Sequence, residues 1–97
     1  MILPELTVGA LDAPTLAALF DDLNAHATVL DVITKGGPVQ HSAGTQVPLR
    51  EAQALLAEGR VRGVQVRYVW QGDEWRDTLL AAADGVRLVR MKRQNEP

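Results

Sequence analysis

The chain has 97 residues, of which 46% are hydrophobic and none is a cysteine. This length supports one hydrophobic core, so residues 1–97 are predicted to form a single domain. The lack of cysteine excludes disulfides and thiolate metal sites and is typical of a reducing compartment, so we expect a cytoplasmic protein. A net charge of -2 and a pI of 5.6 argue against nucleic-acid binding, because domains with that role usually have a pI above about 9.

The charges are distributed unevenly along the chain. Residues 1–46 contain five acids and one base, a net charge of -4, whereas residues 47–97 contain nine bases and seven acids, a net charge of +2. No segment approaches the roughly 20 apolar residues of a membrane-spanning helix. The first residues also lack the basic and long apolar regions of a signal peptide. We therefore expect neither membrane insertion nor export.

The N-terminal part of the chain predicts an apolar arm followed by a helix. Residues 1–11 are mostly apolar and favour either a short strand or an irregular lead-in. Asp12 then offers a helix N-cap, and Pro14 follows in the first turn. Apolar residues recur at helical spacing: Leu16, Leu19, Phe20, Leu23 and Ala27. A helix over 13–26 follows from this pattern.

The middle of the chain predicts a strand, a loop and a second helix. Residues 28–35 are rich in β-branched side chains and apolar on both faces, which favours a strand inside a sheet. Residues 36–47 lack periodicity and contain three glycines, so they are predicted as a long polar loop. Pro48 precedes a helical pattern over 49–58 that lacks a convincing N-cap, and Gly59 is expected to end that helix.

The C-terminal half predicts an antiparallel meander. Two turn signals, Gly72-Asp73 and Asp84-Gly85, separate three stretches with strand character, and residues 94–97 are expected to form a flexible tail. The chain is therefore predicted to be α+β, with element order α-β-α-β-β-β. We expect a two-layer sandwich in which two helices pack on one face of a mostly antiparallel sheet of about four strands.

The first hairpin of the meander has a predicted register. A two-residue turn at Gly72-Asp73 places Trp70 opposite Trp75 and Tyr68 opposite Asp77. One face then gathers apolar side chains for the core: Val64, Val66, Tyr68, Trp70, Trp75, Leu79 and Ala81. The two tryptophans are expected to form a cross-strand aromatic pair.

Two carboxylates are expected to be partly buried, and each then needs a partner. Asp77 lies on the predicted core face, where the Tyr68 hydroxyl is the expected partner. Asp31 lies within the apolar strand over 28–35, where Lys35 or an arginine is the expected partner. Both residues are interpreted as structural rather than as an acid–base pair.

The second hairpin admits two registers that place the last strand differently. A two-residue loop at Asp84-Gly85 puts Arg90 beside Leu79 on the core face. A three-residue loop with Gly85 in the left-handed conformation instead puts Val89 and Met91 inside. We predict the three-residue loop, because it buries aliphatic side chains in place of an arginine.

With that register, the other face of the meander carries a basic patch: Arg67, Arg76, Arg90 and Lys92. Guanidinium groups give planar, bidentate hydrogen bonds to phosphates and carboxylates, so the patch is a candidate site for an anionic or protein partner. The alternative is a solvated face on which arginine stems cover exposed aliphatic side chains. Self-association through this face or an edge strand is a further option.

No motif in the chain predicts a catalytic or cofactor site. His41 with Ser42 and Thr45 in the long loop is the one place where a base and hydroxyls lie together, so a small enzyme or ligand binder using residues 36–47 stays as an alternative. A winged-helix nucleic-acid binder is a third reading, although the helix over 49–58 offers Arg50 alone as a base. The two histidines are not at metal-ligand spacing, so no metal and no cofactor are expected. The leading hypothesis is a non-enzymatic interaction or regulatory module.

Overall fold

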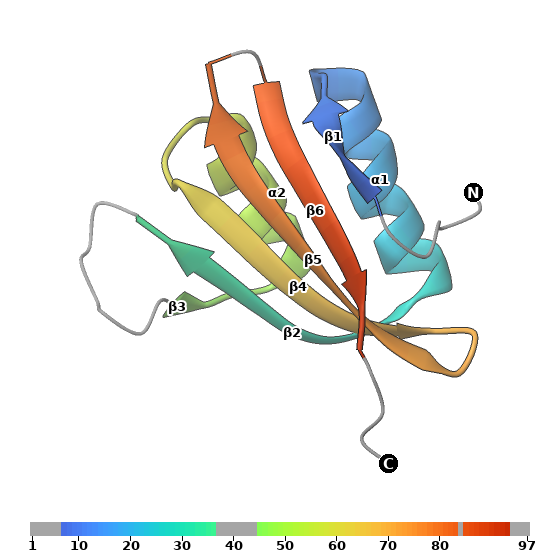
Figure 1. The fold of residues 1–97 in the computed structure, drawn as a ribbon. Coiled ribbons are helices and arrows are strands. Elements are labelled where there is room, and N and C mark those ends of the chain that lie inside the picture. Colours follow the sequence, from blue (N-terminus) through green and yellow to red (C-terminus); the bar gives the residue numbers. More distant parts are fainter. Residues whose placement is uncertain (1–6, 37–44, 84, 94–97) are drawn as a thin grey trace.

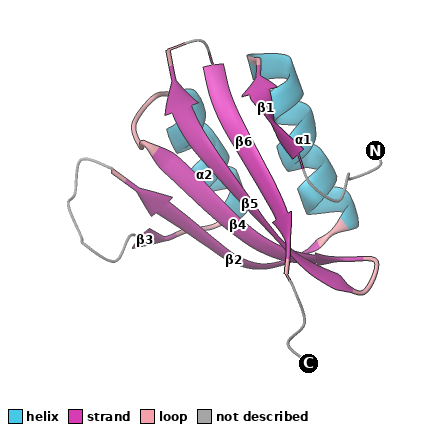
Figure 2. Cartoon of the chain, in the orientation of Figure 1, coloured by secondary structure: helices cyan, strands magenta, loops and turns pink. Residues whose placement is uncertain are grey.

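A computed structural model describes residues 7–36, 45–83 and 85–93 of the chain. It contains two helices, α1 (Ala13–His26) and α2 (Leu49–Ala57), and six strands: β1 (Thr7–Leu11), β2 (Thr28–Lys35), β3 (Thr45–Gln46), β4 (Gly63–Trp70), β5 (Asp73–Ala82) and β6 (Gly85–Lys92). All strands join one sheet in the order β1-β6-β5-β4-β2-β3, and every neighbouring pair is antiparallel. Both helices lie on the same face of this sheet (Figures 1 and 2). The predicted α+β class and two-layer arrangement are confirmed, with β1 and β3 added to the expected strands.

Helix α1 has the predicted bounds, because its start is fixed by a side-chain cap. The Asp12 carboxylate accepts a hydrogen bond from the Thr15 backbone N–H at 2.9 Å, and Pro14 lies in the first turn. Its apolar stripe is buried against the sheet: Leu16, Leu19, Phe20 and Leu23. At Ala27 the backbone becomes extended and leads directly into β2.

Helix α2 ends as predicted but begins without a side-chain cap. Pro48 occupies the N-cap position and makes no side-chain hydrogen bond, in keeping with the weak start signal in the sequence. Gly59 adopts a φ of +70°, and the backbone N–H of Arg60 returns to the Leu55 carbonyl at 2.9 Å. This left-handed glycine closes the helix.

The turn between β4 and β5 lies one residue earlier than predicted. Trp70 pairs with Asp73, so Gln71 and Gly72 form the turn, with φ values of +51° and +82°. Two successive positive φ values match the twist of a tight hairpin. Each residue of β4 therefore pairs with a β5 residue two positions earlier than predicted, for example Tyr68 with Trp75 instead of Asp77. Because side chains alternate between faces, a shift of two leaves every side chain on its predicted face. Most of the predicted core residues on this face are buried, together with Asp77: Val64, Val66, Tyr68, Trp75 and Leu79. Trp70 is only half-buried and Ala81 is exposed.

The predicted register of β6 is wrong. Ala82 pairs with Gly85, which leaves two residues between the strands instead of three. This moves Arg90 to the position opposite Asp77 on the helix-covered face, where it is 2% exposed, and turns Met91 outward with 57% of its surface exposed. The preference for burying Met91 failed because Asp77, already buried on that face, needs a cation opposite it more than it needs an aliphatic neighbour.

Of the two alternatives predicted for residues 1–11, the short strand is confirmed for the last five residues, which form β1. This strand pairs with β6 at one edge of the sheet, with Leu11 opposite Val86. Gly85 has a φ of +133°, and a Cβ added there would lie 2.6 Å from the Leu11 carbonyl oxygen. A glycine is thus needed for β1 to approach the start of β6.

Strand β2 contains a bulge that the alternating pattern did not reveal. Val29 pairs with Tyr68 and Asp31 pairs with Arg67, so Leu30 is the extra residue between them. Because of this residue, Val29 and Val32 contact the same core although they are three positions apart, and Leu30 is exposed.

The predicted loop over 36–47 contains a short strand near its end. Strand β3 pairs with Ile33 and Thr34 of β2 and forms a two-residue edge strand on that side of the sheet. His41 and Ser42, named above as candidate catalytic residues, lie outside the described residues.

Candidate interaction surface

The four predicted site residues do not share one surface. Arg67 and Arg76 lie directly opposite each other on β4 and β5, on the face turned away from the helices, which we call the outer face. Arg90 lies on the helix-covered face and is buried. Lys92 is two residues after Arg90 on β6 and therefore lies on the same side of the sheet. It forms an ion pair with Asp73 at 3.4 Å near the end of the sheet. The predicted patch is therefore reduced to its first two arginines.

Arg90 belongs to a buried network on the helix-covered face. Its Nε and Nη2 donate to the two carboxylate oxygens of Asp77 at 2.9 and 2.7 Å, and the Tyr68 hydroxyl donates to Asp77 Oδ1 at 2.9 Å. The Arg90 and Asp77 side chains are 2% and 0% exposed. The predicted contact between Tyr68 and Asp77 is confirmed, and Arg90 completes it as a bidentate partner.

The pKa shifts of this network follow from burial and from the enclosed charges. Burial, followed by the nearby Asp77 carboxylate, raises the pKa of Tyr68 well above its usual value of 10.0. Burial alone works to lower the pKa of Arg90, but the hydrogen bonds and charge of Asp77 outweigh it, so the net shift is upward. The tyrosine therefore stays neutral and the arginine stays charged, which is a structural arrangement rather than an acid–base one.

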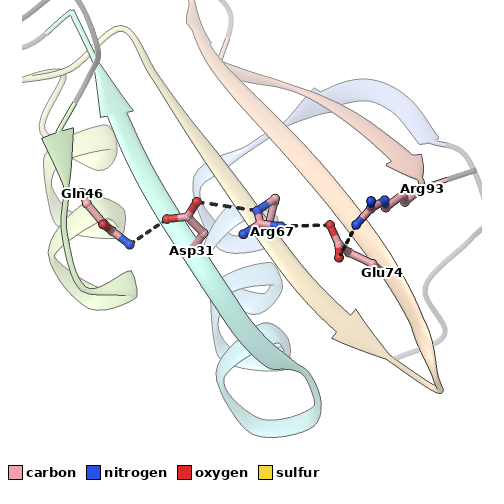
Figure 3. Close-up of polar contacts among 5 residues, drawn as sticks. All are labelled: Asp31, Gln46, Arg67, Glu74 and Arg93. Atoms are coloured by element: carbon pink, nitrogen blue, oxygen red, sulfur yellow. Dashed lines mark hydrogen bonds and ion pairs between the residues drawn. The ribbon is translucent and has the colours of Figure 1, made fainter.

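A second network crosses the outer face (Figure 3). Gln46 donates to Asp31 at 2.7 Å, and Arg67 contacts Asp31 at 3.6 Å and Glu74 at 3.1 Å. Arg93, just after β6, donates to the other oxygen of Glu74 at 3.2 Å. The expected pairing of Asp31 with an arginine is confirmed. The network spans the sheet from β3 to the end of β6 with charges of alternating sign.

The pKa of Glu74 lies below its usual value. Partial burial works to raise it, but hydrogen bonds from Arg67 and Arg93, together with their charges, have the larger combined effect. Glu74 is therefore ionised at neutral pH and holds both arginines in place.

Cations on the outer face outnumber carboxylates. Among the described residues, strand register places seven charged side chains on this face. Five are basic, Lys35, Arg67, Arg76, Arg87 and Arg93, and two are acidic, Asp31 and Glu74, which gives these seven a net charge of +3. Within the described part of the chain, Arg76 and Arg87 form no ion pair within 4 Å. Sequence reasoning missed Arg87 and Arg93 because their face depends on the register of β6.

Apolar side chains lie among these cations. Leu80 on β5 is 45% exposed and Met91 on β6 is 57% exposed. Half-buried Val69, Val89 and Ile33 lie on the same face. The outer face is thus both basic and apolar, as protein-binding surfaces often are.

The outer face contains a depression of about 220 Å³ at the start of β5 and the end of β6. Glu74 and Arg93 are register neighbours, as are Arg76 and Met91, since Trp75 pairs with Lys92 and Arg76 with Met91. These four side chains stand on the outer face around the Trp75–Lys92 pair, whose own side chains point to the other face. The depression therefore has two arginines, one carboxylate and one methionine at its corners.

A groove of about 330 Å³ on the helical side lacks comparable polar chemistry. It lies between the start of α1, the end of α2 and the turn joining β5 to β6, and alanine and leucine side chains form most of its wall. Its polar side chains are Asp12 and Gln53, and Asp12 already caps α1. Among the described residues, no group of three or more His, Asp or Glu side chains is arranged to hold a metal ion.

Comparisons with known proteins returned no relative. No protein-family model, no curated protein and no solved structure matches the chain. Within the described ranges, neither helix has the length and apolar character required to cross a membrane.

Proposed function

We propose that this protein is a non-enzymatic interaction module of the cytoplasm that binds an acidic protein partner through its outer face. The observation that carries the proposal is the pair of arginines at the centre of that face. Arg67 and Arg76 stand directly opposite each other, and like charges in that position destabilise a sheet. Asp31 and Glu74 compensate Arg67, whereas Arg76 has no ion-pair partner among the described residues.

An acidic partner would supply the missing compensation. Both described carboxylates of the outer face are engaged by Arg67 and Arg93, and Arg76 and Arg87 have no ion-pair partner among the described residues, so their positive charge is open to a partner. Complementary charge mainly accelerates association and selects the partner. Leu80 and Met91, exposed between the cations, would add apolar contact area.

Affinity capture with a matched pair of charge reversals tests this proposal. The tagged protein, its Arg76→Glu variant and its Arg50→Glu variant are used to capture partners from lysate. Arg50 is exposed on α2, so its reversal changes net charge equally but on the helical layer. We expect an acidic protein to be retained by the parent and by Arg50→Glu, and lost with Arg76→Glu.

The same set of proteins captured by all three forms would contradict the proposal. A second copy of this chain is one outcome to separate, because Asp21 and Asp22 lie on the helical layer opposite the basic face. Sedimentation of the purified parent and of Arg76→Glu distinguishes it, since self-association through the outer face raises the mass of the parent alone.

A further inference from the structure

We propose that the depression between β5 and β6 is a carboxylate-binding subsite, in which Arg76 and Arg93 hold an acidic side chain of an extended partner segment. The inference rests on the proposed function and specifies which part of the outer face makes the charged contact. It also assigns Met91, at the adjacent corner, to an apolar side chain of the same segment.

Unused hydrogen-bond donors support this assignment. A guanidinium carries five N–H donors. Arg76 uses none of them in an ion pair with a described residue, and Arg93 makes its described side-chain contact through Nη1 alone. A carboxylate placed between them can therefore accept bidentate, charge-assisted hydrogen bonds, the strongest kind available on an exposed surface.

The protein's own Glu74 shows that a carboxylate fits between arginines on this face. Its two oxygens accept from Arg67 at 3.1 Å and from Arg93 at 3.2 Å. Arg76, Arg93 and Glu74 line the depression, and Arg67 contacts Glu74 from β4, so these four side chains carry a net charge of +2. One guest carboxylate lowers this to +1, so the attraction of the arginines exceeds the repulsion from Glu74.

The size and surroundings of the depression favour a side chain over a cofactor. Its volume of about 220 Å³ is below the roughly 300–1,000 Å³ of typical small-molecule sites. Met91 lies directly across from Arg76 and is flexible and exposed, so it can adapt to an apolar neighbour. In an extended segment, residues i and i+2 face the same side, which matches an acidic residue followed two positions later by an apolar one.

NMR titration of the full-length protein tests the subsite. The probe is an acetylated, amidated peptide that alternates threonine with glutamate and leucine, and the matched control replaces each glutamate by glutamine. We expect the glutamate peptide to shift the Nε resonances of Arg76 and Arg93 and the methyl resonance of Met91. The glutamine peptide leaves them unchanged at the same concentration.

Matched variants sharpen the titration. Arg76→Gln is expected to weaken binding of the glutamate peptide about tenfold or more, because a charge-assisted contact is lost. Arg50→Gln on α2 removes one positive charge from the helical layer and is expected to leave the affinity unchanged.

The contrary results distinguish failure of the subsite from failure of the proposed outer face. Peptide shifts confined to Arg87 and Leu80 would overturn the subsite and leave the proposed outer face intact. Shifts confined to the helical layer would overturn both. No shift at Arg76 overturns the subsite, and the capture experiment then decides the proposed function separately. Inorganic phosphate that shifts Arg76 and Arg93 as strongly as the peptide would replace the carboxylate assignment with a general anion site.

Discussion

Two arginine–carboxylate networks lie on opposite faces of the same sheet and differ mainly in burial. On the helix-covered face, Arg90 and Asp77 are 2% and 0% exposed, and their ion-pair distance is 2.7 Å. On the outer face, the arginines that contact Glu74 are 36% and 66% exposed, at 3.1 and 3.2 Å. The first pair is enclosed by the fold, whereas solvent and other molecules can reach the second.

This difference separates a structural role from the proposed binding role. A buried charge without its partner is costly, because the protein interior solvates it poorly. An exposed pair is screened by water and salt and contributes little to stability. The inner network is therefore committed to the fold, while the outer network can exchange its contacts with those of a partner.

The largest expected effect comes from breaking the inner pair. Asp77→Asn removes the carboxylate and leaves Arg90 charged and buried, so we expect the free energy of unfolding to fall by about 3–5 kcal/mol. Urea unfolding followed by circular dichroism measures this loss.

A double variant serves as the control for that loss. Asp77→Leu with Arg90→Met replaces the pair by apolar side chains, and we expect it to recover part of the stability lost in the single variant. The recovery is incomplete because the Tyr68 hydroxyl loses its acceptor. A single variant within about 0.5 kcal/mol of the parent, the usual range for surface substitutions, would contradict the structural role of the pair.

A smaller effect is expected at Tyr68. Tyr68→Phe removes the hydroxyl that donates to the Asp77 carboxylate, and hydrogen bonds to charged groups contribute about 1.5–3 kcal/mol. The pKa of Tyr68 is raised in the folded protein, so folded tyrosine retains its proton after unfolded tyrosine has lost it. The stabilisation is complete below pH 10 and declines as pH rises from there toward the folded pKa.

The single tyrosine of the chain makes this pH dependence directly measurable. Tyrosinate absorbance is expected to appear near pH 10 in urea and only at higher pH in the folded protein. Tyr68→Phe should also flatten the decline of stability above pH 10. Native absorbance that titrates near pH 10 would place the hydroxyl in solvent and contradict its burial.

The smallest effect on stability is expected on the outer face. Glu74→Gln removes the carboxylate shared by Arg67 and Arg93, yet all three groups are partly exposed, so we expect a loss of stability much smaller than that of Asp77→Asn, measured by the same urea unfolding. The loss should shrink further in 1 M salt, where the Debye length is about 3 Å. A loss as large as that of Asp77→Asn would remove the distinction between the two networks.

The sequence predicted the elements well wherever local chemistry determines them. Asp12 and the apolar spacing of α1 fix that helix, and Gly59 ends α2. The inward face of β4 and β5 was also predicted, although the turn is Gln71–Gly72 rather than Gly72–Asp73. That error did not change the predicted faces, because a pairing shifted by two residues keeps each side chain on the same side of the sheet.

The candidate site was harder to predict because it depends on the parity of β6. One residue of difference in the turn before Gly85 exchanges Arg90 with Met91 between the two faces. The useful signal was Asp77, since a carboxylate on a core face requires more than a tyrosine hydroxyl as its partner. Placing Arg90 opposite Asp77 puts Arg87 and Arg93 on the outer face, because side chains alternate between faces along the strand.

The local sequence pattern did not reveal several other features of the fold. The bulge at Leu30 has no glycine to mark it, and β3 is a two-residue strand inside the predicted loop. A short strand within residues 1–11 was one of two predicted alternatives, but its pairing with β6 depends on residues distant in the sequence. The sequence predicts Gly85 as a turn residue. The structure adds the close approach of the Leu11 carbonyl oxygen at that position.

We propose that the outer arginines contact a partner, whereas the buried arginine maintains the fold. Side-by-side capture of an acidic partner with Arg76→Glu and with the double variant Asp77→Leu/Arg90→Met tests it most directly, once both are shown to be folded. We predict that Arg76→Glu loses the partner and that the double variant retains it. Loss from the folded double variant together with retention by Arg76→Glu would contradict the claim.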